Sequence, residues 1–192
     1  MKKILIGTHN IGKFREISFL LNKKIKKISP NSLEIKSPKE TGNTFLANAK
    51  LKAKYFSKHV NFPVISDDSG LCIKALNGNP GIYSARLAKR HGSFFKAMKR
   101  ILEKMKNKKN RSAVFVCSLS YISEKKKSYS VVGKIKGTIS KKIIGKRGFG
   151  YDPIFIPDKY LVTFGQMPRL KKILIDHRYI AFQKLKKKIK IL

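Results

Sequence analysis

A chain of 192 residues with 42% apolar side chains is long enough for one domain, or for two lobes that share a core, and its composition excludes wholesale disorder. No stretch approaches the roughly 18 apolar residues of a membrane span, and the N-terminal apolar run is too short for a signal peptide. Cys72 and Cys117 lack metal-ligand spacing. We predict that both are buried free thiols, which favours the cytoplasm.

The formal net charge of +35 at pH 7 raises the question of a nucleic-acid partner. The basic residues are 37 Lys and 8 Arg, spread along the whole chain, whereas proteins that recognise bases and phosphates favour the forked Arg side chain. Ile, Asn, Phe and Tyr are also abundant, as in proteins of A/T-rich genomes. We therefore interpret the charge as a compositional bias and expect nucleic-acid binding to be non-specific at most. Acids number only ten, so the pair Asp67-Asp68 is expected to have a function.

The first half of the chain predicts a strand, a turn and a helix, followed by a second helix. Residues 2–7 form an apolar, β-branched run typical of a buried strand, and Phe14 and Ile17 lie in the helix that follows the turn. Asn43 or Thr44 can cap the second helix. Further extended segments are expected at 63–66, which ends at the Asp pair, and at 71–76.

The second half predicts one more helix, a hairpin and a terminal helix. A turn cluster at 77–81 precedes a helix capped by Ser93. The β-rich segments 112–122 and 128–136 are joined by a short charged turn and predict a hairpin, and the last helix is expected over about 178–189. Because βα units are combined with a hairpin, the predicted fold class is α/β, a mixed sheet flanked by helices.

The first candidate site is the loop GTHNIGKF, Gly7 to Phe14, which follows the first strand. It matches a P-loop except at its last position, where Phe14 replaces the Ser or Thr that binds Mg²⁺. Gly7 and Gly12 allow the backbone to approach an anion, and Lys13 at a helix N-terminus adds positive potential. The loop is therefore either an incomplete P-loop, another triphosphate-binding device, or an ordinary turn.

The second candidate is Ile65-Ser-Asp-Asp-Ser-Gly70. Adjacent side chains on a strand point to opposite faces, so both carboxylates can bind one metal ion only if the strand has already turned, as Ser69-Gly70 would allow. Mg²⁺ prefers oxygen ligands and few protein carboxylates, and Glu40 is the nearest third candidate.

The third candidate is Arg147-Gly-Phe-Gly-Tyr-Asp-Pro153. Glycines on both sides of Phe149 expose the ring for stacking on a base, and Asp152 can accept a hydrogen bond from a purine edge. Each candidate alone is weak, but a phosphate loop, carboxylates and an exposed ring together suit a magnesium–nucleotide site.

Six stretches, in order and over almost the whole chain, carry a resemblance. They are Thr8–Lys13, Glu40–Phe45 with Asn48-Ala49, Asp67–Leu71, Gly78–Arg86, Gly148–Pro153 and His177-Arg178. In these motifs the chain resembles the inosine/xanthosine triphosphate pyrophosphatases, which remove non-standard purine nucleotides. The resemblance implies an elongated mixed α/β fold in two lobes, with the active site in the cleft between them, and usually a homodimer. It implies hydrolysis of a purine nucleoside triphosphate (ITP, dITP or XTP) to the monophosphate and pyrophosphate.

The resemblance also implies roles for individual residues. Asp68 is the catalytic base and a metal ligand, Glu40 is a ligand of Mg²⁺, and Asp67 is a further candidate ligand. The opening loop becomes a triphosphate and sugar clamp, so Phe14 is no defect. Phe149 is expected to stack on the base and Arg178 to lie near its 6-keto oxygen. The implied substrate-binding residues are Thr8, His9, Asn10, Ile11, Gly12, Lys13, Ser69, Phe149, Gly150, Tyr151, Asp152, Lys172, His177 and Arg178.

Two alternatives remain open from the residues alone. One is a P-loop NTPase or kinase that uses residues 63–68 as its metal-binding strand. The other is a basic nucleic-acid-binding protein, favoured by charge. The chain also departs from the family pattern near 87–93 and 167–176, where basic and neutral residues replace most of the usual acids.

Overall fold

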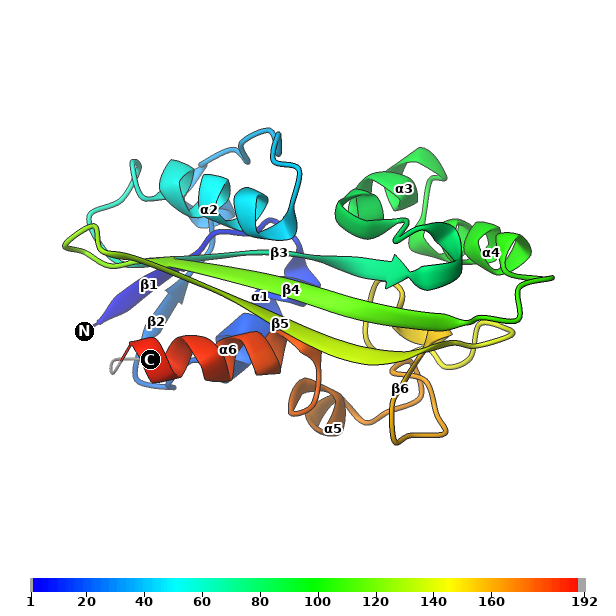
Figure 1. Cartoon of the computed structure of the whole chain (residues 1–192). Coiled ribbons are helices and arrows are strands. Elements are labelled where there is room, and N and C mark those ends of the chain that lie inside the picture. The colour runs from blue at the N-terminus through cyan, green and yellow to red at the C-terminus, as the bar shows by residue number, and fades with distance from the viewer. Residues whose placement is uncertain (1, 190–192) are drawn as a thin grey trace. The chain divides into compact units, whose positions relative to one another are not determined.

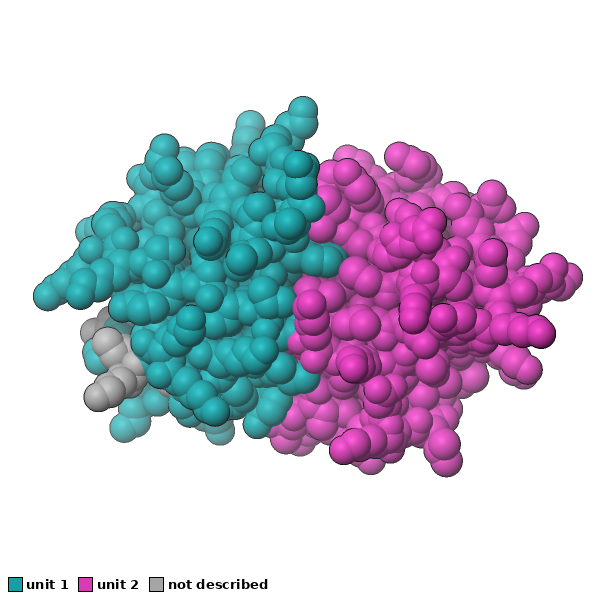
Figure 2. Space-filling model, in the orientation of Figure 1, with its two compact units in different colours: residues 1–68, 117–133, 178–192 teal, residues 69–116, 134–177 magenta. Residues whose placement is uncertain are grey.

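The computed structural model describes residues 2–189, which form two compact units (Figures 1 and 2). Unit 1 contains the chain up to Asp68, residues 117–133 and the chain from Arg178 onward, and unit 2 contains residues 69–116 and 134–177. Neither unit is continuous in sequence, because three strands each contribute residues to both. The assignment of the whole chain to a single pyrophosphatase domain stays a prediction.

Six strands of the described residues form one sheet in the order β2-β1-β3-β4-β5-β6. In β1, Leu5 lies opposite Ile28 of β2 and Val64 of β3, and both pairings are parallel, whereas β5 and β6 pair antiparallel. The predicted mixed α/β fold is therefore confirmed. The strands are β1 Lys3–Ile6, β2 Lys26–Ile28, β3 Val64–Ile73, β4 Ser112–Ile122, β5 Ser128–Ile139 and β6 Phe155–Pro157.

In unit 1, helices cover both faces of the sheet (Figure 1). Ile17 of α1 and Leu185 of α6 belong to one buried cluster with Ile4 and Ile6 of β1, whereas Phe56 of α2 packs with Leu5 on the opposite face. Alternate strand residues thus meet different helices, as the strand period requires. The helices are α1 Ile11–Leu20, capped by Asn10, α2 Phe45–Phe56, capped by Thr44, and α6 His177–Lys188.

In unit 2, α3 and α4 pack on the sheet through a second apolar cluster. Met98 and Ile101 of α4 meet Leu71 and Ile73 of β3 there, together with Phe155 of β6. Ser93 caps α4 as predicted, since its side chain accepts from the Lys96 N–H. The helices are α3 Ser84–Arg90, α4 Phe94–Lys104 and α5 Arg169–Ile173, with 3₁₀ turns at Lys74–Leu76, Gly81–Tyr83 and Asp152–Ile154; in unit 1 a 3₁₀ turn spans Asn31–Leu33.

Two expectations from the sequence were wrong. The strand that ends at the Asp pair and the strand that begins at Leu71 are one strand, β3, which runs through Asp67, Asp68 and Ser69 without a turn. Cys72 is half-buried rather than buried, although burial still raises the pKa of its thiol, whereas Cys117 is buried as predicted; both are free. Among the described residues, no helix has the length and apolarity needed to cross a membrane.

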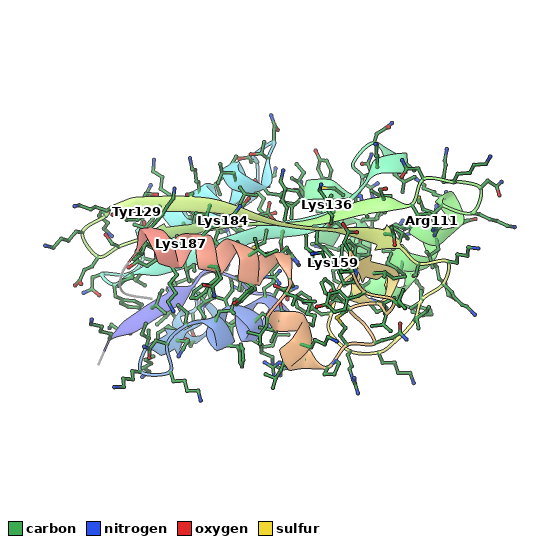
Figure 3. All side chains as sticks on the ribbon, turned by 60° about the horizontal axis from the view of Figure 1, so that its bottom comes forward. Arg111, Tyr129, Lys136, Lys159, Lys184 and Lys187 are labelled. Atoms are coloured by element: carbon green, nitrogen blue, oxygen red, sulfur yellow. The ribbon has the colours of Figure 1, made fainter. Side chains whose placement is uncertain are left out.

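The charged side chains are distributed unevenly between surface and interior. Lys136, Lys159, Lys184 and Lys187 illustrate the basic side chains that extend into solvent (Figure 3). The acids behave differently, because five of the ten are buried: Glu16, Asp67, Asp68, Asp152 and Asp176. A buried carboxylate is costly unless it has a cation or a hydrogen-bond donor as a partner, so these five residues indicate where polar interactions occur in the interior.

Candidate active site

The loop between β1 and α1 is held in shape by its own polar groups. Asn10 accepts a hydrogen bond from the Lys13 N–H at 3.0 Å, and Thr8 Oγ1 accepts one from the Asn10 N–H at 3.2 Å. The loop approaches β3 and α2 closely, because a Cβ on Gly7 would lie 2.2 Å from Ser66 Oγ and 2.5 Å from the Phe56 ring. Gly7 is therefore required for close packing.

Phe14 occupies the position where a P-loop has its metal-binding hydroxyl, and it packs against the apolar cluster of unit 1. The side chain therefore has a structural role, and this loop cannot bind a metal ion through a hydroxyl at that position. The P-loop alternative loses its main support here.

Asp67 and Asp68 point to opposite faces of β3, because the strand continues through them. The predicted turn, which would have let both bind one metal ion, is absent. The two carboxylates have different direct partners within unit 1, although Lys13 and Lys52 act electrostatically on both.

Asp67 is fully buried and lies among cations. Its Oδ2 is 3.2 Å from Lys13 Nζ and 3.6 Å from Arg178 Nε, and the Arg178 guanidinium also donates to Glu16. Burial alone would raise the pKa of Asp67, but Lys13, Arg178 and Lys52 together lower it to about 2. Asp67 is thus ionised at neutral pH and paired with Lys13 and Arg178, which makes it a poor candidate for a metal ligand.

Asp68 lies on the other face, beside α2. Its Oδ2 accepts from Asn48 Nδ2 at 3.0 Å, and the Asn48 Oδ1 accepts from the Gly42 N–H at 2.8 Å, so one buried amide orients both the carboxylate and the loop before α2. Burial raises the pKa of Asp68, and the nearby Glu40 carboxylate raises it further, against the opposing effects of Lys13, Lys52 and Asn48. A raised pKa suits a group that must take up a proton.

Lys52, one turn after Asn48 on α2, completes this arrangement. Its Nζ lies 2.6 Å from Glu40 Oε1. Burial opposes its charge, but the carboxylates of Asp67, Glu40 and Asp68 outweigh that effect and raise the pKa of Lys52. Lys52 is therefore a buried, firmly charged ammonium group beside Glu40 and Asp68.

Glu40 and Asp68 are the oxygen donors that a divalent cation could use in unit 1. Burial first, and then the Glu40 carboxylate, raise the pKa of Asp68, and a bound cation would offset the repulsion between the two carboxylates. Residues 2–189 contain no group of three or more His, Cys, Asp or Glu side chains suited to a metal ion.

In unit 2, Asp152 organises the glycine–aromatic turn. Gly148 and Gly150 have positive φ angles of 74° and 65°, which favour glycine, and Asp152 Oδ2 accepts from the Phe149 N–H at 2.9 Å. A Cβ on Gly148 would lie 2.1 Å from that carboxylate oxygen. Tyr151 points inward, and its hydroxyl donates to the Ser84 carbonyl at 2.9 Å. The turn therefore presents Phe149, which is half-buried, and not Tyr151.

Lys172 is the second organising residue of unit 2. Its buried ammonium lies 3.4 Å from Asp152 Oδ2, 3.0 Å from Asp176 Oδ2 and 5.1 Å from the Phe149 ring centroid. His177 stacks on Phe115 at 4.8 Å with an interplanar angle of 9°. The structure thus brings Phe149, Asp152, Lys172 and His177 into one unit.

The remaining predicted residues have varied positions. Arg178 belongs to unit 1, although it follows His177 directly. The His9 ring contacts the Ile35 carbonyl at 3.0 Å and the Ser37 hydroxyl at 2.6 Å, which gives it a role in fixing the segment before α2. Ile11 is exposed at the start of α1, and Ser69 is half-buried on β3. The substrate contacts predicted for these residues stay predictions.

Three residues with evident importance were not among the predicted site residues: Glu16, Asn48 and Lys52. The signal for Lys52 was present in the sequence, because Asn48 and Lys52 are four residues apart and so share one face of a helix. Glu16 gave no comparable signal, since its partner Arg178 is 162 residues away.

Comparisons with known proteins agree with one another and extend over nearly the whole chain. The pattern of the Ham1 family matches residues 4–188. A protein of Oceanobacillus iheyensis named dITP/XTP pyrophosphatase is 42% identical, covering 97% of this chain and 98% of its own, and one of Caulobacter vibrioides with the same name is 39% identical, with 96% of each covered. A solved structure of a HAM1 protein from Coxiella burnetii superposes with a TM-score of 0.88 at 32% identity over 99% of each chain, and the Staphylococcus aureus Ham1 protein with 0.87 at 36% over 98%.

Proposed function

The chain belongs to the Ham1 family, and from this premise we propose that it hydrolyses the non-standard purine nucleoside triphosphates ITP, dITP and XTP to the monophosphate and pyrophosphate. Relatives of nearly equal length carry the name dITP/XTP pyrophosphatase. The observation in this chain that carries the proposal is the buried Asp68, oriented by Asn48 and accompanied by Glu40, Lys52 and Lys13. The biological role would be to clear such nucleotides from the precursor pool.

Asp68 is the residue that we assign to activate water. Its raised pKa favours uptake of a proton, and the Asn48 amide holds one carboxylate oxygen so that the other can accept from a water molecule. Attack by this water at the α-phosphorus releases pyrophosphate. Asp68 thus takes the proton that the attacking water must lose.

Lys13 and Lys52 supply the fixed positive charge that the triphosphate requires. Both are anchored by carboxylates, Lys13 by Asp67 and Lys52 by Glu40, so they need no rearrangement when charge develops in the transition state. Glu40 and Asp68 would hold Mg²⁺, which when bound neutralises phosphate charge and lowers the pKa of water.

Recognition of the base is assigned to the residues that the resemblance implies. Phe149, which is half-buried in unit 2, is the residue proposed to stack on the base. Discrimination against adenine requires a donor for the 6-keto oxygen, since a 6-amino group facing that donor leaves a buried group unpaired at a cost of about 1–3 kcal/mol. Arg178 is the proposed donor.

Two further assignments belong to this proposal. The protein acts in the cytoplasm, a location supported by its free cysteines. It acts as a homodimer, which the exposed apolar side chains of Leu161, Leu170 and Leu174 in unit 2 support, because a partner subunit would remove such surface from water. Light scattering after gel filtration measures the oligomeric state directly.

The experiment that tests the proposed reaction is a nucleotide panel. ITP, dITP, XTP, GTP and ATP are incubated with the protein and Mg²⁺, and pyrophosphate and orthophosphate are measured separately. We expect pyrophosphate from the first three, little turnover of GTP and ATP, loss of activity in excess chelator, and higher rates toward alkaline pH. Orthophosphate as the direct product, or equal turnover of all five nucleotides, would refute the proposal.

A further inference from the structure

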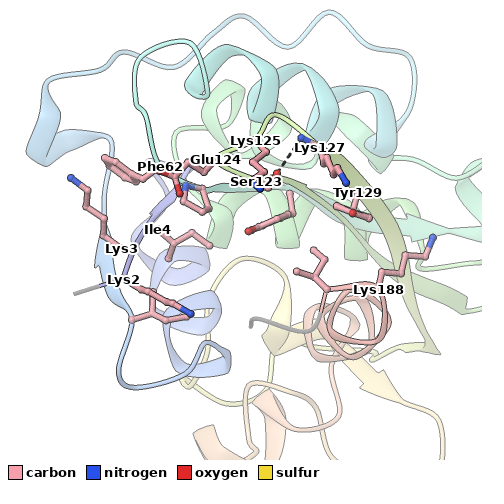
Figure 4. A pocket seen from close by; sticks show the side chains of 14 residues that line it. Lys2, Lys3, Ile4, Phe62, Ser123, Glu124, Lys125, Lys127, Tyr129 and Lys188 are labelled. Carbon is pink, nitrogen blue, oxygen red and sulfur yellow. Dashed lines mark hydrogen bonds between the residues drawn. The ribbon is translucent and has the colours of Figure 1, made fainter.

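Unit 1 contains a pocket that the proposed reaction does not use. It has a volume of about 640 Å³ and is formed by the N-terminal strand, the segment before β3, the β4–β5 hairpin and the end of α6 (Figure 4). A volume of this size suits a small organic ligand. None of its lining residues is among the site residues predicted from the sequence or described above.

The rim of this pocket is strongly basic. Lys2, Lys3, Lys125, Lys127 and Lys188 line it, and all five are exposed, whereas Glu124 is the one acid among the lining residues within 2–189. Five ammonium groups around one opening create a positive potential that a single carboxylate does not cancel. The ligand that this rim would attract is an anion.

The interior, in contrast, is apolar and aromatic. Ile4, Ile25 and Tyr121 are buried beneath the opening, and Tyr129 and Phe62 are half-buried at its walls. The Lys3 ammonium already lies 4.3 Å from the Phe62 ring centroid, so one cation of the rim is in contact with an aromatic wall. An inorganic anion would contact the lysines but not the aromatic rings.

The hairpin that carries part of the rim is held firmly. The Lys126 Nζ donates to the Ser57 carbonyl at 2.7 Å, and the Ser123 N–H donates to the Lys127 carbonyl at 2.9 Å. Tyr121 and Tyr129, on the two strands of this hairpin, have ring centroids 6.4 Å apart. The backbone at Lys125 and Lys127 and the ring of Tyr129 are therefore positioned by the fold itself.

We propose that this pocket binds a nucleotide unit, with the base against Tyr129 and the phosphate among the lysines of the rim. A ligand with a flat aromatic ring and an attached anionic group would contact both the aromatic walls and the lysines of the rim. Proteins that bind single-stranded nucleic acids combine the same two features, aromatic side chains that stack on bases and a positively charged groove that binds the backbone. The same chemistry is offered by a free mononucleotide and by one nucleotide of a single strand. Lys184 and Lys187 of α6 extend the basic surface near the Tyr129 side of the hairpin, since Lys184 Nζ donates to the Val132 carbonyl (Figure 3).

Fluorescence anisotropy of a labelled hexathymidylate with the full-length protein in chelator tests this proposal. The triple variant Lys2→Glu, Lys127→Glu and Lys188→Glu should bind at least about tenfold more weakly, because lost phosphate contacts act multiplicatively and depend steeply on salt. The matched control is Lys89→Glu, Lys106→Glu and Lys136→Glu, three exposed lysines of unit 2 with the same change of net charge. Equal losses in both triple variants would mean that net charge alone governs binding, which overturns the proposal.

A second pair of variants tests the aromatic wall. Tyr129→Ala should weaken binding by at least about fivefold, whereas Tyr129→Phe retains the ring and should bind as the unchanged protein does.

Displacement of the probe by thymidine monophosphate would show that a free nucleotide suffices, and binding without such displacement would assign the pocket to a strand. No effect of Tyr129→Ala, or displacement by dodecanoate or a glutamate-rich peptide but by no nucleotide, overturns the proposal. Pyrophosphate release from ITP should be unchanged in all these variants, so the outcome is independent of the proposed reaction.

Discussion

Asp67 and Asp68 are adjacent and chemically identical, yet the fold gives them opposite properties. Asp67 lies among Lys13, Arg178 and Lys52, which lower its pKa to about 2, whereas burial and Glu40 raise the pKa of Asp68. The division follows from the strand period, because a continuous strand sends neighbouring side chains to opposite faces. One carboxylate is therefore an electrostatic anchor, and the other is suited to exchange a proton.

Replacement of Asp68 by Asn should separate catalysis from stability. The amide oxygen can still accept from Asn48, but it cannot take a proton, so pyrophosphate release from ITP should fall by about 10²–10⁴-fold. Because the ionised Asp68 is disfavoured by burial and by Glu40, the variant should unfold at the same or a higher temperature. Activity within about threefold of the unchanged protein at saturating Mg²⁺ would contradict a base role for Asp68.

For Asp67 we expect a contribution to stability that is lost at acidic pH. Its carboxyl has a pKa of 3.8 in its ordinary state and about 2 in the fold, so the unfolded chain takes up the proton first as the pH falls. The stability it confers is complete above pH 3.8 and is lost on going down through about pH 2. Between pH 6 and pH 3 this loss amounts to about 1 kcal/mol.

Urea unfolding of Asp67→Asn and of the unchanged protein at both pH values measures this effect. The destabilisation caused by the substitution should be smaller at pH 3 than at pH 6 by about that 1 kcal/mol. A difference that does not depend on pH would show that Asp67 is not an ionised partner of Lys13 and Arg178.

Among the elements, α2 carries more of the site than its sequence suggests. Asn48 and Lys52 lie one turn apart and face β3, and Asn48 joins the loop at Gly42 to Asp68. Lys50, an exposed residue of the same helix, serves as a control.

Asn48→Ala should therefore reduce both stability and activity, since the Gly42 N–H and the Asp68 carboxylate each lose a buried partner. The expected destabilisation is about 1–3 kcal/mol, measured by urea unfolding, and pyrophosphate release should fall as well because Asp68 loses its orientation. Lys50→Ala should change neither quantity appreciably. Equal behaviour of the two variants would remove Asn48 from the site.

The elements differ in how well the sequence predicts them, and the reasons are local. The strand at 3–6, the cap at Thr44, the cap at Ser93 and the hairpin follow from apolar runs and capping residues. The continuity of β3 does not, because Asp, Ser and Gly disfavour strands and are tolerated here only through buried partners such as Lys13 and Asn48. β2, three residues long with two lysines, shows no periodic pattern at all.

The candidate site was predictable where motifs are contiguous and not where they depend on distant contacts. Asp68, Glu40 and Lys13 were found from short motifs, and the structure places all three in unit 1. The ion pair between Glu16 and Arg178 joins residues 162 positions apart. A pairing of this kind depends on the topology that brings α1 and α6 onto the same face of the sheet, which no local pattern contains.

At the level of the whole molecule, the excess of positive charge has a physical consequence that is independent of any partner. The chain carries a formal charge of +35, while five of its ten acids are buried and cannot neutralise surface lysines at close range. Like charges on the folded surface lie closer together than in the unfolded chain, so their repulsion favours unfolding. Salt screens exposed charges over about 8–10 Å at physiological ionic strength, and it screens buried pairs much less.

Added sodium chloride should therefore stabilise this protein. Raising the concentration from about 20 mM to 150 mM shortens the screening length by a factor of about 2.7. This weakens the repulsion among exposed lysines but leaves the buried pairs Asp67–Lys13 and Lys172–Asp176 largely intact. The thermal midpoint should rise across this range. It should rise less in a variant in which several exposed lysines of unit 2, such as Lys89, Lys106 and Lys136, are changed to Glu, because that surface then repels itself less. Addition of an uncharged solute at equal osmolality controls for effects of water activity. A midpoint that falls with salt would mean that surface attractions, rather than repulsions, dominate the electrostatics of the fold.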